Sequence, residues 1–383
     1  MKRISCILLI CVFFGMATSR ADITYSPIAD TSIIVTGIRS DSTNSDSVVI
    51  SASKTTTGTD TVAALYDGSL SGVASASSSS WYSLNPIFSG QSVTSSTFYG
   101  PNTSVYDPSL GVGNIRAVGS YKYSNSPSGS NTDHGMMYVG AVTGGGTWSQ
   151  IDATTLVTNG TLINTIAHST MGNLVVGNYD TSLAAGHAFI YNTVNQTWLN
   201  LNPANSVSVT AYGIWQNGGS TSTSYTIAGG FSDLNSGGID EGYLVTYDST
   251  SNSFSHFKTY NFNNQPITSL VSHFDGITAT ADGFNLTGDY LASGTNGAFF
   301  ASVSVLGDGT YSDASWTDIS YPNASLTSGN TVVSNSVLGI FVNGGTQSYI
   351  ATVPEPKPKG LVLFALCILI GIHSIRRMAK KSN

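Results

Sequence analysis

The hydrophobic positions of residues 22–352 fall in short apolar runs separated by glycine, asparagine, aspartate and serine. No stretch of this segment sustains the 3.6-residue spacing of apolar positions that an amphipathic helix requires. Short apolar runs bounded by turn-forming residues are typical of β-strands. The scarcity of lysine and glutamate, which are strong helix formers, supports the same interpretation. We therefore predict an all-β fold for residues 22–352.

Four sequence signatures recur along this segment, which indicates a repeat. The first is an apolar run that ends in glycine, at Val118-Gly119, Val176-Gly177, Ala228-Gly229 and Thr287-Gly288. The second is a glycine before an apolar strand, at Gly135-Met136, Gly186-His187, Gly242-Tyr243 and Gly297-Ala298. The third is a large aromatic residue after serine or threonine, at Trp81, Trp148, Trp198, Phe254 and Trp316. The fourth is a glycine-isoleucine step, at Thr36-Gly37-Ile38, Tyr212-Gly213-Ile214, Asp275-Gly276-Ile277 and Leu338-Gly339-Ile340.

Each repeat unit therefore supplies about four strands, and Val337 to Val353 supplies the first two strands of a partial sixth unit. Four-stranded sheets that are apolar on both faces must pack on neighbours, and a ring of blades buries all of these faces. We predict a β-propeller-like ring of five to six four-stranded blades, closed by a strand near Ile23 to Ile28. The recurring aromatic residues are expected to fill the space between blades rather than to form a carbohydrate-stacking rim. Tandem β-sandwiches and a β-solenoid remain alternatives.

The first 21 residues have the three parts of a secretory signal peptide. Lys2 and Arg3 form the positive region, and Ile4 to Met16 is apolar. Small residues at Ser19 and Ala21 place the cleavage site after Ala21. The apolar stretch is shorter than the roughly 18 residues of a membrane-spanning helix. We therefore expect residues 1–21 to direct export through the secretion translocon.

The C-terminal residues 353–383 carry three blocks in a fixed order. Pro354, Glu355 and Pro356 are followed by the apolar run 360–375 and then by Arg376 and Arg377. A helix of this run would be about 24 Å long, short of the roughly 30 Å of a bilayer core. The basic residues should keep the last residues on the cytoplasmic side.

This tail resembles the PEP-CTERM sorting signal of Gram-negative bacteria, with matches at Pro354, Glu355, Pro356, Arg376 and Arg377. The resemblance implies transient anchoring in the inner membrane and recognition by an exosortase. Lys357 and Lys359 make this tail more basic than the family pattern. A plain membrane anchor with a proline-rich stalk is the alternative.

The repeat unit also resembles the HAF repeat of exported bacterial proteins. Gly186-His187-Ala188-Phe189 matches its last motif in full, and the other copies keep only the glycine and the apolar positions. The resemblance implies export and repetition, and it implies no particular chemistry.

Composition narrows the possible functions of the segment between the two ends. Its lack of cysteine excludes a disulfide, a thiolate metal site and a cysteine nucleophile there. Five basic and 20 acidic residues lie between Asp22 and Val353, a net charge of −15 that argues against nucleic acid as a partner. No metal-binding histidine spacing and no catalytic motif is evident, so we predict no cofactor, metal or catalytic residue. Glu241, the sole glutamate of the segment, lies in a polar stretch interpreted as a solvated turn, with a calcium loop as the alternative.

These observations support three hypotheses for function. The first is a non-enzymatic protein of the cell envelope or extracellular matrix, exported, sorted by its tail and associated with polysaccharide at the outer surface. The second is an exported carbohydrate-active enzyme, which three or more carboxylates converging on the central pore would favour. The third is a glycan-binding adhesin, which an exposed rim of aromatic side chains would favour.

Overall fold

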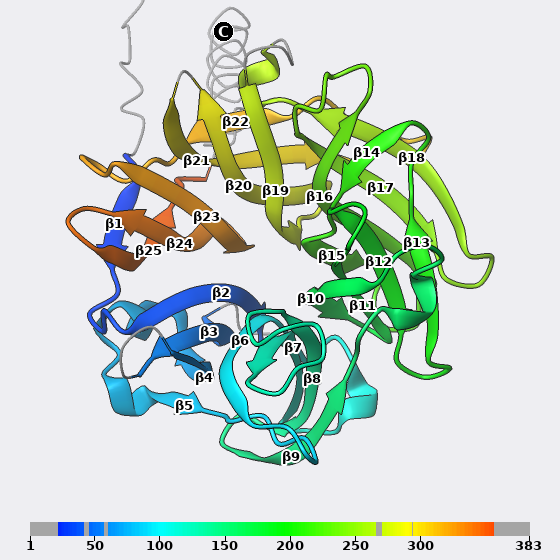
Figure 1. Ribbon diagram of the computed structural model, residues 1–383. Helices are drawn as coiled ribbons and strands as arrows, with labels where there is room; N and C mark the ends of the chain where they lie inside the picture. The colour runs from blue at the N-terminus through cyan, green and yellow to red at the C-terminus, as the bar shows by residue number, and fades with distance from the viewer. Residues whose placement is uncertain (1–21, 42–45, 57–59, 266–269, 293, 356–383) are drawn as a thin grey trace, which may run out of the picture. The chain divides into compact units, whose positions relative to one another are not determined.

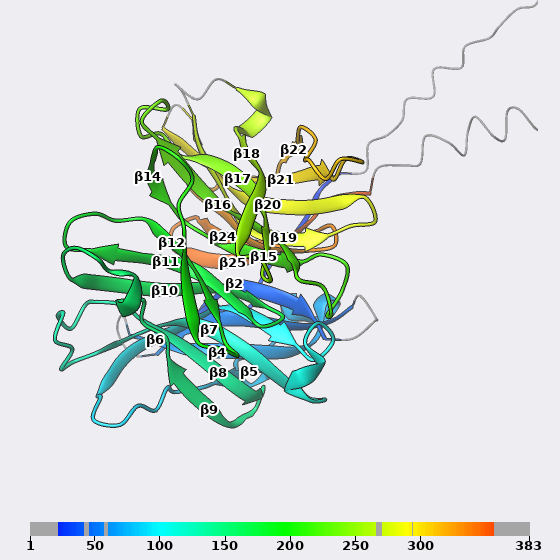
Figure 2. The same cartoon turned by 90° about the vertical axis from the view of Figure 1, so that its right-hand side faces the viewer.

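The computed structural model describes residues 22–41, 46–56, 60–265, 270–292 and 294–355. Within this part of the chain, Thr24–Val353 forms one compact unit built from β-strands and short 3-10 helices. The strands lie around a common axis as a propeller (Figure 1), and Figure 2 shows the same ring from the side. The predicted all-β, propeller-like fold is confirmed.

The strands group into four-stranded antiparallel units, called blades here and numbered in chain order. Blade 1 contains β2 (Ile33–Ser40), β3 (Ser47–Thr55), β4 (Thr61–Ser69) and β5 (Trp81–Ser83). Blade 2 contains β6 (Val93–Thr103), β7 (Asn114–Tyr123), β8 (His134–Ala141) and β9 (Gly144–Gln150). Blade 3 contains β10 (Leu162–Met171), β11 (Leu174–Thr181), β12 (His187–Asn192) and β13 (Thr197–Leu201).

The first strand of blade 4 is interrupted, so that two short strands pair with the same neighbour. Blade 4 contains β14 (Ser206–Val209), β15 (Gly213–Gln216), β16 (Ser224–Asp233), β17 (Glu241–Asp248) and β18 (Ser253–Tyr260). Blade 5 contains β19 (Leu270–Ala279), β20 (Gly283–Ala292), β21 (Thr295–Ser304) and β22 (Ser315–Asp318). Blade 6 contains β23 (Leu326–Val333), β24 (Ser336–Val342), β25 (Thr346–Thr352) and β1 (Thr24–Pro27). One parallel pair, Asn296 with Leu326, joins blades 5 and 6 into a single eight-stranded sheet.

Short 3-10 helices lie in the connections between these strands. They are η1 (Leu70–Ser75), η2 (Ser78–Ser80), η3 (Pro108–Leu110), η4 (Thr154–Leu156) and η5 (Phe262–Asn264). No helix in the described ranges is long and apolar enough to cross a membrane. The predicted signal peptide, residues 1–21, and the predicted hydrophobic helix, residues 360–375, lie outside the described residues.

The two ends of the compact unit close the ring together. β1 pairs antiparallel with β25, from Thr24 opposite Thr352 to Pro27 opposite Tyr349. The next residue, Ile28, donates its backbone N–H to Ser348 at 2.8 Å and is 2 % exposed. The predicted closing strand near Ile23 to Ile28 is therefore present as the outer strand of blade 6. Such closure leaves no unpaired end blade.

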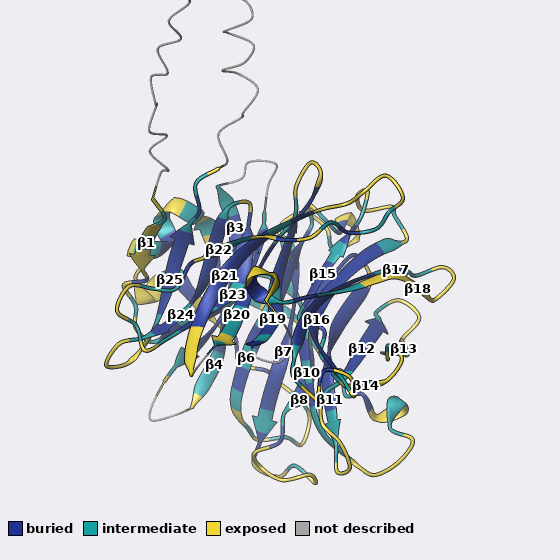
Figure 3. Ribbon diagram, turned by 90° about the horizontal axis from the view of Figure 1, so that it is seen from above, coloured by how far each residue is buried: buried dark blue, intermediate teal, exposed yellow. Residues whose placement is uncertain are grey.

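The hydrophobic core lies between neighbouring blades, where Figure 3 shows the strands as buried and the connecting loops as exposed. One cluster joins blades 6 and 1 through Val333, Ile350 and Ile38, and includes Trp81. Trp148, Trp198 and Trp316 pack against similar clusters between other blades. Phe254 differs, because it is 39 % exposed. Four of the five recurring aromatic residues therefore fill the space between blades.

Two details of the predicted repeat were wrong. Leu338-Gly339-Ile340 lies on β24, the second strand of its blade, whereas the other glycine-isoleucine steps lie on first strands. The segment Val337 to Val353 accordingly supplies the second and third strands of blade 6 rather than the first two. The first strand is β23, whose polar sequence conceals it, and the fourth is β1 from the other end of the compact unit.

Candidate functional site

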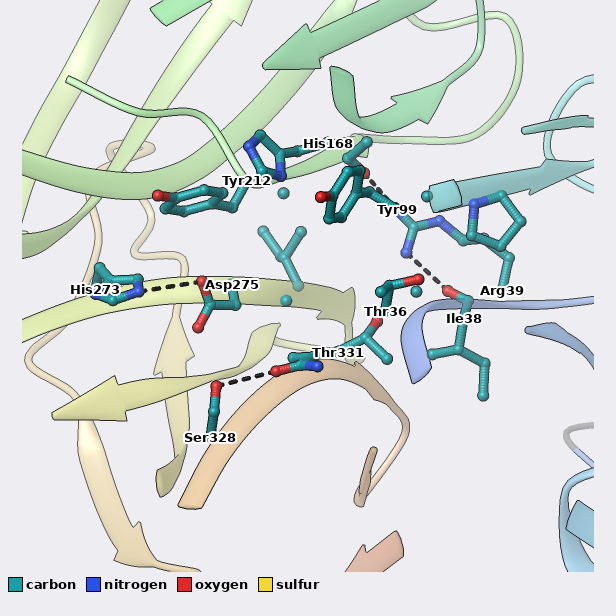
Figure 4. A pocket seen from close by; sticks show the side chains of 18 of the residues that line it. Thr36, Ile38, Arg39, Tyr99, His168, Tyr212, His273, Asp275, Ser328 and Thr331 are labelled. Carbon is teal, nitrogen blue, oxygen red and sulfur yellow. Dashed lines mark hydrogen bonds and ion pairs between the residues drawn. The ribbon is translucent and has the colours of Figure 1, made fainter. Parts of the chain in front are cut away.

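A cavity of about 210 Å³ lies where the first strands of the blades converge on the axis. These inner strands, β2, β6, β10, β15, β19 and β23, each contact the next around the ring. Every one of them contributes residues to the cavity wall, and β20 adds Asp289. Figure 4 shows the cavity with its lining side chains. Its volume is below the roughly 300–1,000 Å³ of drug-sized ligand sites, so it suits a small polar molecule or the end of a larger one.

A β-bulge in each inner strand turns one side chain toward this cavity. In blades 1, 2, 3, 5 and 6 the register skips one residue of the inner strand, and this residue has no partner on the second strand. In blade 4 the break between β14 and β15 has the same effect. The six residues placed in this way are Thr36, Tyr99, His168, Tyr212, Asp275 and Asn330. Bulges commonly re-aim a side chain in this manner.

The glycine that ends the second strand's apolar run makes the bulge possible. A Cβ atom on Gly119 would lie 1.9 Å from the carbonyl oxygen of Thr97 on the inner strand. The equivalent distances are 2.1 Å from Gly177 to Ile166 and 1.9 Å from Gly288 to His273. No real side chain tolerates such an approach to backbone. The recurring glycine of the first signature is therefore explained by the close approach of the bulged strand.

Aromatic rings from three successive blades form one wall of the cavity, and the His273 ring of the next blade lies beside them. The ring centroids are 5.0 Å apart for Tyr99 and His168, 4.5 Å for His168 and Tyr212, and 5.5 Å for Tyr212 and His273. Figure 4 shows Tyr212, His168 and Tyr99 along the same side. Tilted and edge-to-face contacts at these distances are favourable for aromatic pairs. We call Tyr99, His168 and Tyr212 the aromatic wall.

The aromatic wall is uncharged near neutral pH. Burial lowers the pKa of His168 to about 4, and its Nε2–H donates to Asn178 Oδ1 at 2.6 Å. Burial likewise raises the pKa of the Tyr99 hydroxyl to about 12 and raises the pKa of Tyr212. The wall therefore offers apolar ring surface with polar atoms at its edges.

A histidine and two carboxylates of blade 5 form the next part of the wall. His273 Nε2 lies 3.3 Å from Asp275 Oδ1 and 2.9 Å from Asp289 Oδ1. Burial raises the pKa of Asp275 to about 6, although the positive charge of His273 acts in the opposite direction. Burial alone would lower the pKa of His273, but Asp275 and Asp289 raise it well above its ordinary value. The side chains keep exposures of 28 %, 17 % and 31 % for His273, Asp275 and Asp289, so they remain open to the cavity.

Arg39 brings a positive charge to the opposite part of the cavity. Its guanidinium donates to the carbonyl oxygens of Ile38 and Ile214 at 3.0 Å each and to Ser169 Oγ at 3.2 Å. It also lies 5.6 Å from the centroid of the Trp215 ring. Burial lowers its pKa to about 10, so it is charged at neutral pH. Among the ion pairs found in the described ranges, none joins Arg39 to a carboxylate.

The remaining bulge residues hold the ring together. Thr36 Oγ1 donates to the carbonyl oxygen of Phe98 at 2.5 Å, and Asn330 Nδ2 donates to that of Val35 at 2.7 Å. Each bond crosses from one inner strand to the next blade. The groups of the cavity left to meet a ligand are therefore the aromatic wall, the His273 cluster and Arg39.

The residues predicted from sequence are not part of this site. Pro354 and Glu355 lie beyond β25, separated from it by Val353, and Glu355 is exposed. Ala21, Pro356, Arg376 and Arg377 lie outside the described residues. Glu241 is 7 % exposed at the start of β17 and accepts a hydrogen bond from Asn261 Nδ2 at 2.8 Å, so its interpretation as part of a solvated turn was wrong.

Sequence reasoning missed the cavity, although a signal for it was present. Thr36, Tyr212 and Asp275 each precede the glycine of a glycine-isoleucine step. Only the strand pairing of the structure shows that the residue at this position has no partner and points to the axis. Tyr99 and His168 occupy the same position in blades 2 and 3, where Tyr99 precedes a glycine and His168 precedes a serine.

Comparisons with known proteins find no match in sequence and only remote likenesses among solved structures. No protein-family model matches the chain, and no curated protein matches it in sequence. A crystal structure of a protein of unknown function from Dyadobacter fermentans has a TM-score of 0.49 at 10 % identity, covering 88 % of this chain and 99 % of that one. A Trypanosoma rangeli sialidase in complex with sialic acid has a TM-score of 0.45 at 10 % identity, and the match covers 85 % of this chain and 55 % of that one. The lectin SapL1 in complex with alpha methyl fucoside has a TM-score of 0.39 at 12 % identity, covering 85 % and 98 %.

The pairing of the strands by itself assigns this chain to the β-propeller class of folds. At these identities and TM-scores, the likenesses carry no inference about a ligand.

Proposed function

We propose that this chain is an exported, non-enzymatic β-propeller that binds the end of a carbohydrate in its central cavity. The observation that carries the proposal is the convergence of six bulge residues on one cavity with an aromatic wall beside a carboxylate cluster. The C–H face of a sugar ring packs on aromatic surface, and its hydroxyl groups bond to carboxylate and guanidinium groups. A cavity of about 210 Å³ limits the bound part to roughly one sugar unit.

Binding of immobilised glycans by the full-length chain in mild detergent tests this proposal. We expect Tyr212→Ala to reduce binding at least tenfold, because it removes one ring of the aromatic wall. Tyr82→Ala is the matched control, since Tyr82 is 38 % exposed on blade 1 and does not line the cavity. Equal binding by both variants would show that the cavity is not the site.

The proposed destination is the cell envelope or the matrix outside it, reached through the tail described from the sequence. Processing at both ends is compatible with the fold, because the ring-closing strands β1 and β25 lie between Thr24 and Thr352. Cleavage after Ala21 and near Pro354 would therefore leave every strand of the described propeller in place. An exosortase is the proposed partner that recognises Pro354, Glu355, Pro356, Arg376 and Arg377.

Mass spectrometry of the protein from its host tests the sorting step. We expect the mature protein to begin at Asp22 and to lack Arg376 and Arg377. Surface protein that retains both arginines would contradict sorting without affecting the proposal for the cavity. A lysine substitution of Glu355, which is exposed beyond the last strand, should block processing while leaving the fold unchanged.

A carbohydrate-active enzyme is the second candidate, and one observation favours it. Asp275 and Asp289 offer oxygens within 4.8 Å of each other, and burial raises the pKa of Asp275 to about 6. Two neighbouring carboxyl groups, one of them with a raised pKa, are typical of glycoside hydrolysis. Two carboxylates line the described cavity, fewer than the three we expected of an enzyme. Release of sugar from glycosides that Asp275→Asn abolishes would favour the enzyme, and binding without release would favour the non-enzymatic protein.

A further inference from the structure

We propose that His273, Asp275 and Asp289 bind one divalent transition-metal ion at the wall of the central cavity. The inference does not depend on the carbohydrate proposal, because it concerns only the three side chains of blade 5. Their potential ligand atoms all lie within 4.8 Å of one another.

The first argument is that a single proton leaves this cluster unsatisfied. His273 Nε2 lies within 3.3 Å of Asp275 Oδ1 and within 2.9 Å of Asp289 Oδ1. One ring nitrogen carries at most one hydrogen, so it makes one well-directed hydrogen bond. Asp289 Oδ1 is shielded from solvent, and although His273 Nε2 lies 2.9 Å away, this oxygen accepts no well-directed hydrogen bond in the described structure. A cation in the position of that proton would contact all three ligand atoms.

The distances between the ligand atoms also fit a metal ion. Bonds of about 2.0–2.2 Å from a transition metal to imidazole nitrogen and carboxylate oxygen place neighbouring ligand atoms about 3.0 Å apart at right angles and about 3.4 Å apart at tetrahedral angles. The observed separations of 2.9 and 3.3 Å lie close to these values. The third separation, between the oxygens of Asp275 and Asp289, is within 4.8 Å.

The sheet holds the three groups in place. His273 on β19 lies directly opposite Asp289 on β20 in the strand register, and Asp275 is the bulge residue two positions further along β19. Sites built on strands are held more precisely than sites on loops. All three side chains line the cavity, so further coordination positions face its interior. Three protein ligands with an open position are the arrangement of many reactive zinc sites.

The ligand types select the class of metal. Ca²⁺ and Mg²⁺ prefer sites made entirely of oxygen, whereas an imidazole nitrogen favours Zn²⁺ and other first-row transition metals. Two carboxylates and one neutral imidazole would balance the charge of a divalent ion. We therefore expect Zn²⁺ and Mn²⁺ to bind more tightly than Ca²⁺.

Titration with MnCl2, followed by the electron paramagnetic resonance signal of free Mn²⁺, tests the site. The sample is the full-length chain without a histidine tag, in mild detergent and stripped of metal with EDTA. We expect one Mn²⁺ per chain, displaced by Zn²⁺ and not by the same concentration of Ca²⁺. Asp289→Asn and Asp275→Asn should each lower the affinity for Mn²⁺ at least tenfold. Asp313→Asn, which alters an 85 % exposed carboxylate, is the matched control.

The absence of stoichiometric binding by the wild-type chain would overturn the proposal, as would equal Mn²⁺ affinity in Asp289→Asn and Asp313→Asn. Circular dichroism in the aromatic region shows whether each variant is folded. Should both cluster variants unfold, the wild-type melting temperature decides the question. Zn²⁺ that binds the folded state raises this temperature, and an unchanged temperature at saturating Zn²⁺ contradicts the site.

Discussion

The pKa of His168 predicts that this propeller loses stability as the pH falls from neutral to mildly acidic values. Burial lowers the pKa of His168 from 6.5 to about 4 in the folded chain. Below pH 6.5 the imidazole of His168 is therefore protonated in the unfolded chain but not in the folded chain, and the free energy of unfolding falls. The loss is complete below pH 4, where both states are protonated.

The size of the effect follows from the two pKa values. Between pH 7.5 and pH 5, this shift lowers the free energy of unfolding by about 2 kcal/mol. This figure is an upper limit, because His168 borders the cavity and is only partly shielded from solvent. The groups around the ring are Tyr99, Tyr212 and the amide of Asn178, with His273 adding repulsion when charged.

Urea unfolding followed by tryptophan fluorescence at pH 7.5 and pH 5 measures the effect. Other groups titrate in this range, so the comparison is with His168→Gln, which cannot take up the proton. We expect the wild-type chain to lose up to about 2 kcal/mol more than His168→Gln between the two pH values. His256→Asn is the control, since His256 is exposed with a φ of 55°, a conformation that asparagine tolerates. Equal losses in the wild-type chain and in His168→Gln would refute the reasoning.

Two further predictions concern the ring itself, and chemical denaturation measures both. Gly37→Ala should cost at least about 2 kcal/mol, because its Cβ would lie 2.1 Å from the carbonyl oxygen of Tyr99 on the next inner strand. Gly307→Ala, which meets no atom within 4 Å, should be close to neutral, and a similar cost for both would contradict close packing at the axis. Ile28→Ala should cost about 2–5 kcal/mol, because this side chain is buried in the cluster that joins blades 6 and 1. Val112→Ala, at a residue 99 % exposed, should change stability by less than about 0.5 kcal/mol, and an equally small change for Ile28→Ala would show that closure by β1 adds little.

Much of the fold could be predicted from the sequence, because each propeller blade is built mainly from strands that are neighbours in the chain. The strands within each of blades 2 to 5 are consecutive in the chain, and their glycines and aromatic residues recur at the same positions. Blade 6 was partly misread for the opposite reason. Its outer strand comes from Thr24–Pro27, and its inner strand Leu326–Val333 has few large apolar residues.

The candidate site could not be predicted from the sequence, because its residues are separated by long stretches of chain. Thr36 and Asn330, for example, line the same cavity only because blades 1 and 6 meet. The raised pKa of Asp275 and the lowered pKa of His168 likewise arise from burial at the axis, which no local pattern encodes.

The sequence by itself determined the all-β class, the repeat and the glycines, because each reflects backbone sterics or the burial of one sheet face within a single unit. The predicted export and sorting signals also rest on sequence alone. The tertiary structure decided which unpaired residues face the axis and which groups meet there. Closing the ring brings the unpaired residue of each inner strand into one cavity, and only then do His273, Asp275 and Asp289 line the same space as the aromatic wall.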